Sequence, residues 1–334
     1  MPKSPSRGSL FAIFLTVFID LLGFGMVLPL LAIYAKAFAI DSTGWVIGLL
    51  VACFSIMQFV FAPVWGRISD SIGRRPVILI GLAGSTIFYA TFGVAAAMQS
   101  LVGLFVARIG AGISGATIST AQAYIADSTT TENRTKGMAL IGAAFGLGFT
   151  FGPLLAAAAL LSTENNVAQS PWPGYVAAAI SGCAFVFAFF KLPESKSADC
   201  QSTHKRLFDL VSFRRALAVP TIGALLLVSF AGQFAFANFE GVLPLVLKNS
   251  ADEGGFGYEL TRVLMFFALL GFVHALAQGM VRGLASRFSE TKLAAGGAAV
   301  GAIGFVVLAW ATHAHSFPLF LAGMIVEGMG FAFI

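Results

Sequence analysis

Long apolar runs, which recur along the whole chain, constrain the fold more than any other feature of this sequence. A helix needs about 20 apolar residues to cross the hydrocarbon core of a bilayer, which is roughly 30 Å thick. Hydrophobic residues make up 58% of the 334 residues and charged residues only 10%, far from the composition of soluble domains. The sequence therefore predicts an all-α membrane protein with ten spans. We expect these spans at Leu10–Tyr34, Trp45–Trp65, Pro76–Met98, Leu101–Ile125, Gly137–Leu161, Gly174–Lys191, Val219–Leu247, Leu260–Val281, Leu293–Thr312 and Phe317–Ile334.

Charge and repetition divide the chain. The longest polar segment, residues 192–218, carries charges of both signs and separates six spans from four. The stretch GRISDSIGRRP (Gly66–Pro76) returns in weaker form as GLASRFSETK (Gly283–Lys292), 217 residues later and again between the second and third spans of its half. This is typical of an internal repeat. We predict a six-helix bundle at 1–191, a linker at 192–218 and a partial bundle at 219–334, and we expect the chain to be part of a longer protein.

The basic residues predict an orientation. When the loops alternate across the membrane, most Lys and Arg fall on one side, which is the cytoplasmic side. The N-terminus and the linker lie on that side, and the first span is too long for a cleaved signal. The sequence pI of 9.3 therefore reports topology and requires no nucleic-acid partner.

The chain lacks the motifs of catalysis and of ATP-driven transport. Cys53, Cys183 and Cys200 have neither metal-ligand spacing nor a plausible disulfide arrangement. There is no phosphate-binding glycine loop followed by Lys-Ser/Thr, and no hydrolytic or redox triad. We therefore expect no enzyme activity, no metal and no cofactor.

The stretch GRISDSIGRRP resembles a motif of a known family. Gly66, Asp70, Gly73, Arg74 and Arg75 match the G-x-x-x-D-x-x-G-R-R/K signature that the major facilitator superfamily carries between its second and third helices. FIDLLGFGMVLPLL, ARIGAGISGA with YIAD, GLGFTFGP, LPES and FVHALAQ together look like the tetracycline and multidrug proton-antiporter branch.

The resemblance implies two six-helix bundles that rock about a midplane site, the second bundle being incomplete here. It implies a secondary transporter, acting as a monomer among the lipids of a bacterial inner membrane, that exports a small hydrophobic or amphiphilic compound in exchange for protons. Two alternatives stay open: a proton symporter or facilitator for a metabolite, and a receptor-like member of the fold that does not transport.

Two charged residues lie within predicted spans and are candidates for proton coupling. Asp20 lies about ten residues, or roughly 15 Å, into the first span, where an ionised carboxylate is costly. It is our candidate for the proton-carrying group; the alternative is a permanent buried pair or hydrogen bond. Arg108 lies on one helical stripe with Gly112, Gly115, Ser119 and Gln122. That stripe should face the interior, and the resemblance gives this arginine a coupling role, against simple helix packing.

The resemblance assigns the remaining motifs. The signature residues Gly66, Asp70, Gly73, Arg74 and Arg75, joined by Asp127 of YIAD, would form a charge cluster that gates the transporter; the alternative is positive-inside anchoring alone. Gly148, Gly152 and Pro153 resemble the antiporter motif. The family continues that motif with two glycines where this chain has Ala156 and Ala157, so a generic packing interface remains the alternative.

Polar residues of the later spans are candidates for the substrate cavity. Gln233 and Glu240 share one helical face, and His274 and Gln278 share another, matching the H-x-x-x-Q of the tetracycline antiporters. The remaining candidates, Gln122 and the intramembrane acid Glu327, complete the set. Phe88 and Gly301 stand where, as we align them, the tetracycline antiporters carry aspartates, which argues against tetracycline itself as the substrate.

Overall fold

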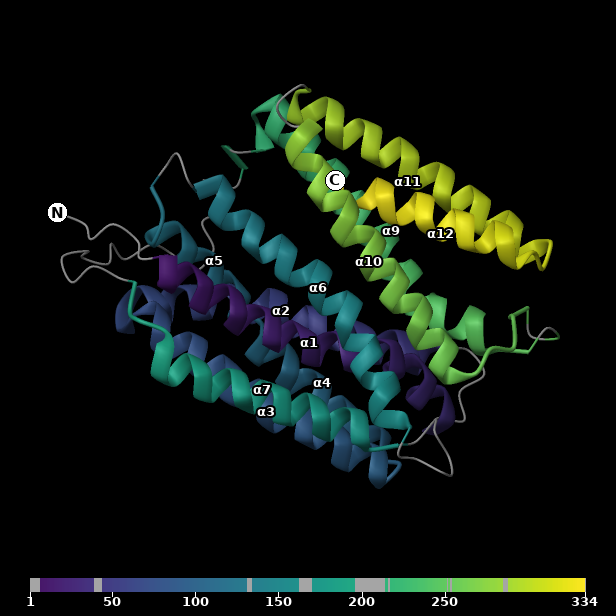
Figure 1. The fold of residues 1–334 in the computed structure, drawn as a ribbon, viewed down its shortest axis with the longest axis horizontal. Helices are drawn as coiled ribbons and strands as arrows, with labels where there is room; N and C mark the ends of the chain where they lie inside the picture. The colour runs from purple at the N-terminus through teal and green to yellow at the C-terminus, as the bar shows by residue number, and fades with distance from the viewer. Residues whose placement is uncertain are drawn as a thin grey trace. The chain divides into compact units, whose positions relative to one another are not determined.

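A computed structural model of the chain describes residues 7–38, 44–130, 134–161, 170–195, 214–215, 217–250, 252, 254–284 and 288–333. Its regular elements are all helices within those ranges (Figure 1). The helices are α1 (Arg7–Phe38), α2 (Trp45–Ile72), α3 (Arg74–Ala97), α4 (Leu101–Gly115), α5 (Ile118–Asp127), α6 (Arg134–Leu160), α7 (Trp172–Lys191), α9 (Pro220–Lys248), α10 (Leu260–Leu284), α11 (Glu290–His313) and α12 (Phe317–Phe331).

The helices have the length and composition of membrane spans. Within the described residues, nine segments are long and apolar enough to cross a bilayer, with α4 and α5 counted as one segment, and α12 is a shorter apolar helix. Large apolar side chains such as Phe59, Phe190 and Phe230 are 69–75% exposed. Exposed apolar side chains of this size are typical of a helix surface that faces lipid rather than water. The predicted all-α membrane fold is confirmed.

The chain forms two compact units, Met1–Phe208 and Asp209–Ile334. In the first, α1 packs against α6 and α7, and α3 packs against α4 and α7. In the second, α11 and α12 lie side by side, and α12 also contacts α10 (Figure 1). Most of the predicted linker, residues 196–213, lies outside the described residues.

Two helices differ from the sequence prediction. The predicted span Leu101–Ile125 is broken at Ala116 and Thr117 into α4 and α5. The second span was predicted to end at Trp65, but α2 continues to Ile72. Gly66 is therefore helical, and an added Cβ there would meet no described atom within 4 Å. The turn that follows α2 is made by Gly73, at φ 106°.

The structure repeats itself at an offset of 216 residues. The turn before α4 has Gln99 at φ 51°, and the turn before α12 has His315, 216 positions later, at φ 46°. The Ser100 amide donates to the Ala95 carbonyl in the first turn, and Ser316 donates to Ala311 in the second, both at 2.9 Å. α4 and α12 begin and end at equivalent residues. This agreement in backbone detail gives each helix of the second unit a counterpart in the first.

Candidate functional site

Asp20 lies on α1 among groups of the first unit. The hydroxyl of Ser181, on α7, donates to Asp20 Oδ1 at 3.1 Å. Ser85, on α3, also hydrogen-bonds the carboxylate. Neither partner carries a charge, so these two bonds leave the carboxylate free to gain or lose a proton without breaking an ion pair. Sequence reasoning did not identify either serine, because nothing in their local pattern marks them.

A small cavity lies beside Asp20. It measures about 30 Å³ and is lined by α1, α3, α4, α5 and the junction between the last two. Asp20 and Thr16 line it from α1, and Gly115 and Thr117 line it from the helix break. One water molecule occupies about 30 Å³ in the liquid. The carboxylate therefore shares a water-sized space with the broken part of the fourth span.

Arg108 is buried on α4, at 3% exposure. Its guanidinium carbon lies 4.4 Å from the centroid of the Phe54 ring on α2, within the range of cation–π attraction, which is worth about 2 kcal/mol when the site is desolvated. The ring of Phe54 is itself held by Phe24 of α1, 5.2 Å away between centroids. Aromatic packing thus fixes the position of the arginine.

Tyr89 links the two charged residues. It is 5% exposed on α3 and interacts electrostatically with both Asp20 and Arg108. Its ring packs so closely on Gly23, one turn from Asp20, that an added Cβ at Gly23 would lie 2.8 Å from it. Asp20, Tyr89 and Arg108 thus form one electrostatic group spanning α1, α3 and α4.

The predicted interior stripe of the fourth span holds only in part. Arg108 and Gly112 are buried, Gly115 and Ser119 are half-buried, and Gln122 is exposed. The break after Gly115 separates the two ends of this stripe.

Arg74 is the centre of the predicted charge cluster. Its Nη1 lies 2.6 Å from Asp70 Oδ1, and its Nε donates to Asp127 Oδ2 at 2.9 Å. A third bond, from Nη1 to the hydroxyl of Ser69, is 2.6 Å long. The side chain of Arg74 is 13% exposed, whereas that of Asp70 is 55% exposed. The cluster joins the end of α2, the start of α3 and the end of α5.

Glu194 belongs to this cluster, although sequence reasoning left it out of the site. Its two carboxylate oxygens accept from the backbone amides of Arg74 at 2.9 Å and Arg75 at 3.1 Å. These amides begin α3 and have no partner within the helix, and a negative charge is favoured at a helix N-terminus. The motif LPES was the available signal. The segment after α7 is held further by Tyr124, whose hydroxyl donates to the Pro193 carbonyl at 3.0 Å.

Arg75 also contacts the C-terminal end of α7. Its Nη2 donates to the Phe189 carbonyl at 2.5 Å. The guanidinium also lies 5.8 Å from the Phe189 ring centroid. Arg75 therefore has protein partners besides any interaction with lipid head groups.

The predicted antiporter motif lies in a seam between α1 and α6. An added Cβ at Gly148 would lie 2.8 Å from Leu21, and one at Gly152 would lie 2.8 Å from the backbone of Gly25. An added Cβ at Gly25 would in turn lie 2.6 Å from the Gly148 carbonyl oxygen. Pro153 lies within α6. These small residues allow the two backbones to touch, which accounts for the packing of the motif and leaves its role in antiport as a proposal.

The polar candidates of the second unit are scattered. Gln233 and Gln278 are exposed, and Glu240 is half-buried. Glu327 is 1% exposed on α12, and its Oε2 has no hydrogen-bond partner among the described residues. The structure does not bring these four side chains together in a described pocket.

His274 is held among aromatic rings. Its ring lies 5.1 Å from Phe236 of α9 and 5.1 Å from Phe331 of α12, and those two rings stack at 4.1 Å. The buried His274 Nε2 has no hydrogen-bond partner among the described residues.

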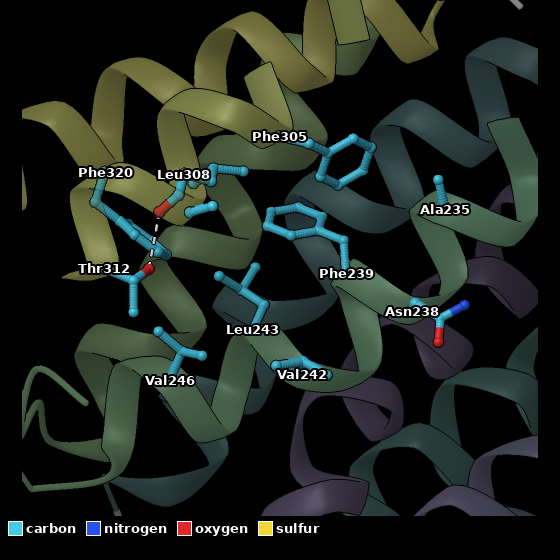
Figure 2. Close-up of a pocket in the computed structure, with 11 residues that line it drawn as sticks. Ala235, Asn238, Phe239, Val242, Leu243, Val246, Phe305, Leu308, Thr312 and Phe320 are labelled. Carbon is cyan, nitrogen blue, oxygen red and sulfur yellow. Dashed lines mark hydrogen bonds between the residues drawn. The ribbon is translucent and has the colours of Figure 1, made fainter. Parts of the chain in front are cut away.

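A larger apolar pocket of about 370 Å³ lies in the second unit, between α9, α11 and α12. In Figure 2 the rings of Phe239 and Phe305 lie next to one another in its lining, in an edge-to-face contact. The Thr312 hydroxyl donates back to the Leu308 carbonyl at 2.8 Å. Its lining residue Ala309 is the counterpart of Gly93 in the first unit, where an added Cβ would meet the Tyr175 ring of α7 at 2.6 Å. In the first unit, the surface around Gly93 is therefore covered by α7. We interpret the pocket as a helix-packing groove and assign no substrate to it.

Phe88 and Gly301, which replace acids of the tetracycline antiporters, serve helix packing. An added Cβ at Gly110 of α4 would overlap the Phe88 ring, and one at Gly330 of α12 would overlap the backbone of Gly301. Neither position offers a group that can hold charge.

Sequence comparison matches residues 13–334 to the Major Facilitator Superfamily. The chain is 37% identical over 320 residues to the class C tetracycline resistance protein of Escherichia coli, covering 95% of this chain and 77% of that protein. It is 34% identical over 303 residues to the class E tetracycline resistance protein of Escherichia coli, covering 89% and 71%.

Two solved structures extend the comparison. The human organic anion transporter MFSD10 is 27% identical, with a TM-score of 0.69 over 98% of this chain and 83% of that one. A D-xylose–proton symporter is 17% identical, with a TM-score of 0.72 over 97% and 80%, and shows a likeness of fold alone. The chain therefore belongs to the Major Facilitator Superfamily of membrane transporters, in the branch that includes the tetracycline resistance proteins.

Proposed function

We propose that this chain is a proton-coupled exporter of a small hydrophobic or amphiphilic compound, working by alternating access in a bacterial plasma membrane with its N-terminus in the cytoplasm. The observation that carries the proposal is Asp20, an acid within a membrane helix that is hydrogen-bonded by the hydroxyls of Ser85 and Ser181. Kinship with two tetracycline resistance proteins supports export of a toxic compound.

Asp20 suits the task of carrying a proton. A carboxylic acid in a membrane helix is costly to ionise, and its serine partners can either donate to a carboxylate or accept from a carboxylic acid. The water-sized cavity beside it gives a proton a place to enter or leave. Each proton that moves inward gains about 2.3 kcal/mol per 100 mV of membrane potential. That energy drives export if protonation of Asp20 and occupancy by substrate exclude one another.

Arg108 and Tyr89 have supporting roles in this proposal. The guanidinium stays charged throughout, and both Asp20 and Arg108 act on Tyr89. Because Tyr89 lies within electrostatic reach of both groups, we expect a change of charge at Asp20 to alter the surroundings of Arg108 on α4. This gives Arg108 a coupling role in the proposal.

The charge cluster around Arg74 is proposed to gate the cycle. Arg74 joins Asp70 of α2 to Asp127 of α5, and Glu194 joins the start of α3 to the segment after α7. Rearrangement of these charges would release several helix ends together. The exposed carboxylate of Asp70 is the member best placed to exchange partners.

Proton coupling at Asp20 is tested in inside-out membrane vesicles from an efflux-deficient bacterial host that expresses the full-length protein. A panel of amphiphilic compounds first identifies those to which the protein gives resistance. Adding such a compound to energised vesicles should dissipate the pH gradient, reported by a pH-sensitive dye, in the wild type. Asp20→Asn should reduce this signal to background because the amide cannot carry a proton.

Controls make the result specific. Asp20→Glu keeps an acid and should retain part of the signal, and Asp252→Asn changes an exposed acid between α9 and α10 and should match the wild type. Full proton exchange in Asp20→Asn would contradict the role of Asp20. If protons and the compound instead cross the membrane in the same direction, the symporter alternative is supported. If the protein moves no compound, the receptor-like alternative is supported.

A further inference from the structure

The junction between α4 and α5 interrupts the hydrogen bonding of the fourth span. The Thr117 amide donates to the Ser114 carbonyl at 3.3 Å, three residues back rather than the helical four. The Ile113 carbonyl therefore loses the amide that would bond it in a continuous helix. A membrane offers no water to such a carbonyl, so irregular backbone is tolerated there only where it is buried in protein or lines a cavity.

Two hydroxyls of the fourth span bond carbonyls at the junction. The Thr117 hydroxyl donates to the Ser114 carbonyl at 2.9 Å, and the Ser119 hydroxyl donates to the Ala116 carbonyl at 3.0 Å. These bonds are local, and any neighbouring helix would permit them.

Two further bonds come from α2. Trp65 Nε1 donates to the Ile113 carbonyl at 2.8 Å, and Gln58 Nε2 donates to the Gly115 carbonyl at 3.1 Å. Each of the four carbonyls from Ile113 onward thus accepts a side-chain hydrogen bond. Because two of the four donors belong to another helix, the break is stabilised by the packing of α2 as well as by its own sequence.

The break lies against the surroundings of Asp20. Gly115 and Asp20 line the same cavity. On α3, an added Cβ at Gly84 would overlap the Ser114 side chain, and the next residue, Ser85, hydrogen-bonds Asp20. A movement of the break is therefore felt both at the wall of the cavity and beside a hydrogen-bond partner of the acid.

We propose that Gln58 is a positioning residue for the Asp20 cavity, with Trp65 as a second anchor of the same break. Gln58 acts through Gly115, whose carbonyl it bonds and which lines the cavity. Trp65 bonds the segment two residues earlier. Loss of either bond should let this wall open more often. The contribution to proton coupling rests on the proposed function; the contacts at the break do not.

Two variants remove the donors and keep apolar bulk. Gln58→Met has a similar length without the N–H group, and Trp65→Phe keeps an aromatic ring without it. Hydrogen–deuterium exchange of the purified full-length protein is followed in segment 112–122. Each variant should raise exchange there by about fivefold, the effect of losing one hydrogen bond. Gln58→His keeps an N–H donor and should bring exchange back toward the wild type.

A second measurement reads Asp20 without transport. Dicyclohexylcarbodiimide adds to protonated carboxyl groups in apolar surroundings, and mass spectrometry of the Asp20 peptide gives the labelling rate. Asp20 is half-buried, so a looser cavity wall should admit the reagent more readily. Both donor-free variants should label Asp20 faster than the wild type. Glu327, in the second unit, should keep its rate in the same digest and is the internal control.

Two substitutions on α2 away from the break are matched controls. Ser55→Met changes an exposed side chain, and Trp45→Phe changes a ring that is 78% exposed. Both should leave exchange and labelling unchanged. A donor-free variant with unchanged exchange loses its assigned role. Faster exchange without faster labelling of Asp20, or a Gln58→His protein as loose as Gln58→Met, would overturn the proposal.

Efflux of ethidium, an amphiphilic aromatic cation, tests the contribution to coupling in preloaded cells. Gradient-driven efflux should fall in Gln58→Met at equal protein level, whereas equilibration of ethidium after the gradient has collapsed should keep the wild-type rate. Equal loss of both would contradict a role specific to coupling. A wild type that exports neither ethidium nor any other compound of the panel contradicts the proposed function instead. Exchange and labelling still decide the roles of Gln58 and Trp65 in that case.

Discussion

At the scale of single residues, Gly73 has two independent reasons to be glycine. Its φ of 106° and ψ of 162° lie in a region that only glycine populates readily. An added Cβ would also lie 2.5 Å from the Glu194 carboxylate that caps α3. The glycine of the signature motif is therefore required by the backbone conformation and by the capping acid together.

Gly73→Ala should destabilise the protein. Strain of this kind costs about 1–3 kcal/mol, and the displaced Glu194 loses its bonds to the start of α3 as well. Thermal unfolding in detergent should show a clear drop in the melting temperature. Gly48→Ala on α2, where an added Cβ meets no described atom within 4 Å, is the matched control and should be neutral or slightly stabilising. Equal melting temperatures for the two variants would contradict this account.

At the scale of helices, the seam between α1 and α6 shows what the glycine motif contributes. Gly25, Gly148 and Gly152 bring the two backbones into contact, and Ala156 and Ala157, which replace two family glycines, are buried at 0% and 7% exposure. Alanine therefore still fits in the continuation of the motif. Close packing along α6 does not depend on the missing glycines.

Gly152→Ala should push α1 and α6 apart. An added Cβ would lie 2.8 Å from the Gly25 backbone, which cannot rotate away as a side chain can, and overpacking typically costs about 1–3 kcal/mol. We expect a lower melting temperature and less folded protein in the membrane fraction. Gly182→Ala on α7, whose Cβ would lie 3.6 Å from Thr86, makes an ordinary contact and should behave as the wild type. A stable Gly152→Ala protein would show that the seam is looser than described.

At the scale of the whole molecule, a substitution at Gly66 can distinguish a role in stability from a role in gating. It lies inside α2, and an added Cβ there meets no described atom within 4 Å. The resemblance places Gly66 in the gating motif, and we propose that this end of α2 approaches another surface during the cycle. Gly66→Ala therefore gives the two roles different outcomes.

We expect Gly66→Ala to leave the melting temperature unchanged and to slow efflux of an exported compound by about tenfold, the effect of roughly 1.4 kcal/mol on a barrier. Efflux rates and thermal unfolding of the same preparation check both parts. Efflux at the wild-type rate would reduce the motif to its structural contacts around Arg74 and Gly73.

The amino-acid sequence by itself determined the membrane class, the helix positions, the repeat and the family, because these depend on local composition and on motifs that are contiguous in the chain. The resemblance grouped Arg74, Asp70 and Asp127 in one charge cluster. Tertiary structure alone decided that Ser85 and Ser181 face Asp20 and that Glu194 caps α3. Those contacts join residues 65 to 161 positions apart. A hydroxyl, an acid or an amide carries no local mark of such a partner, since only the packing of the helices brings it within hydrogen-bonding distance.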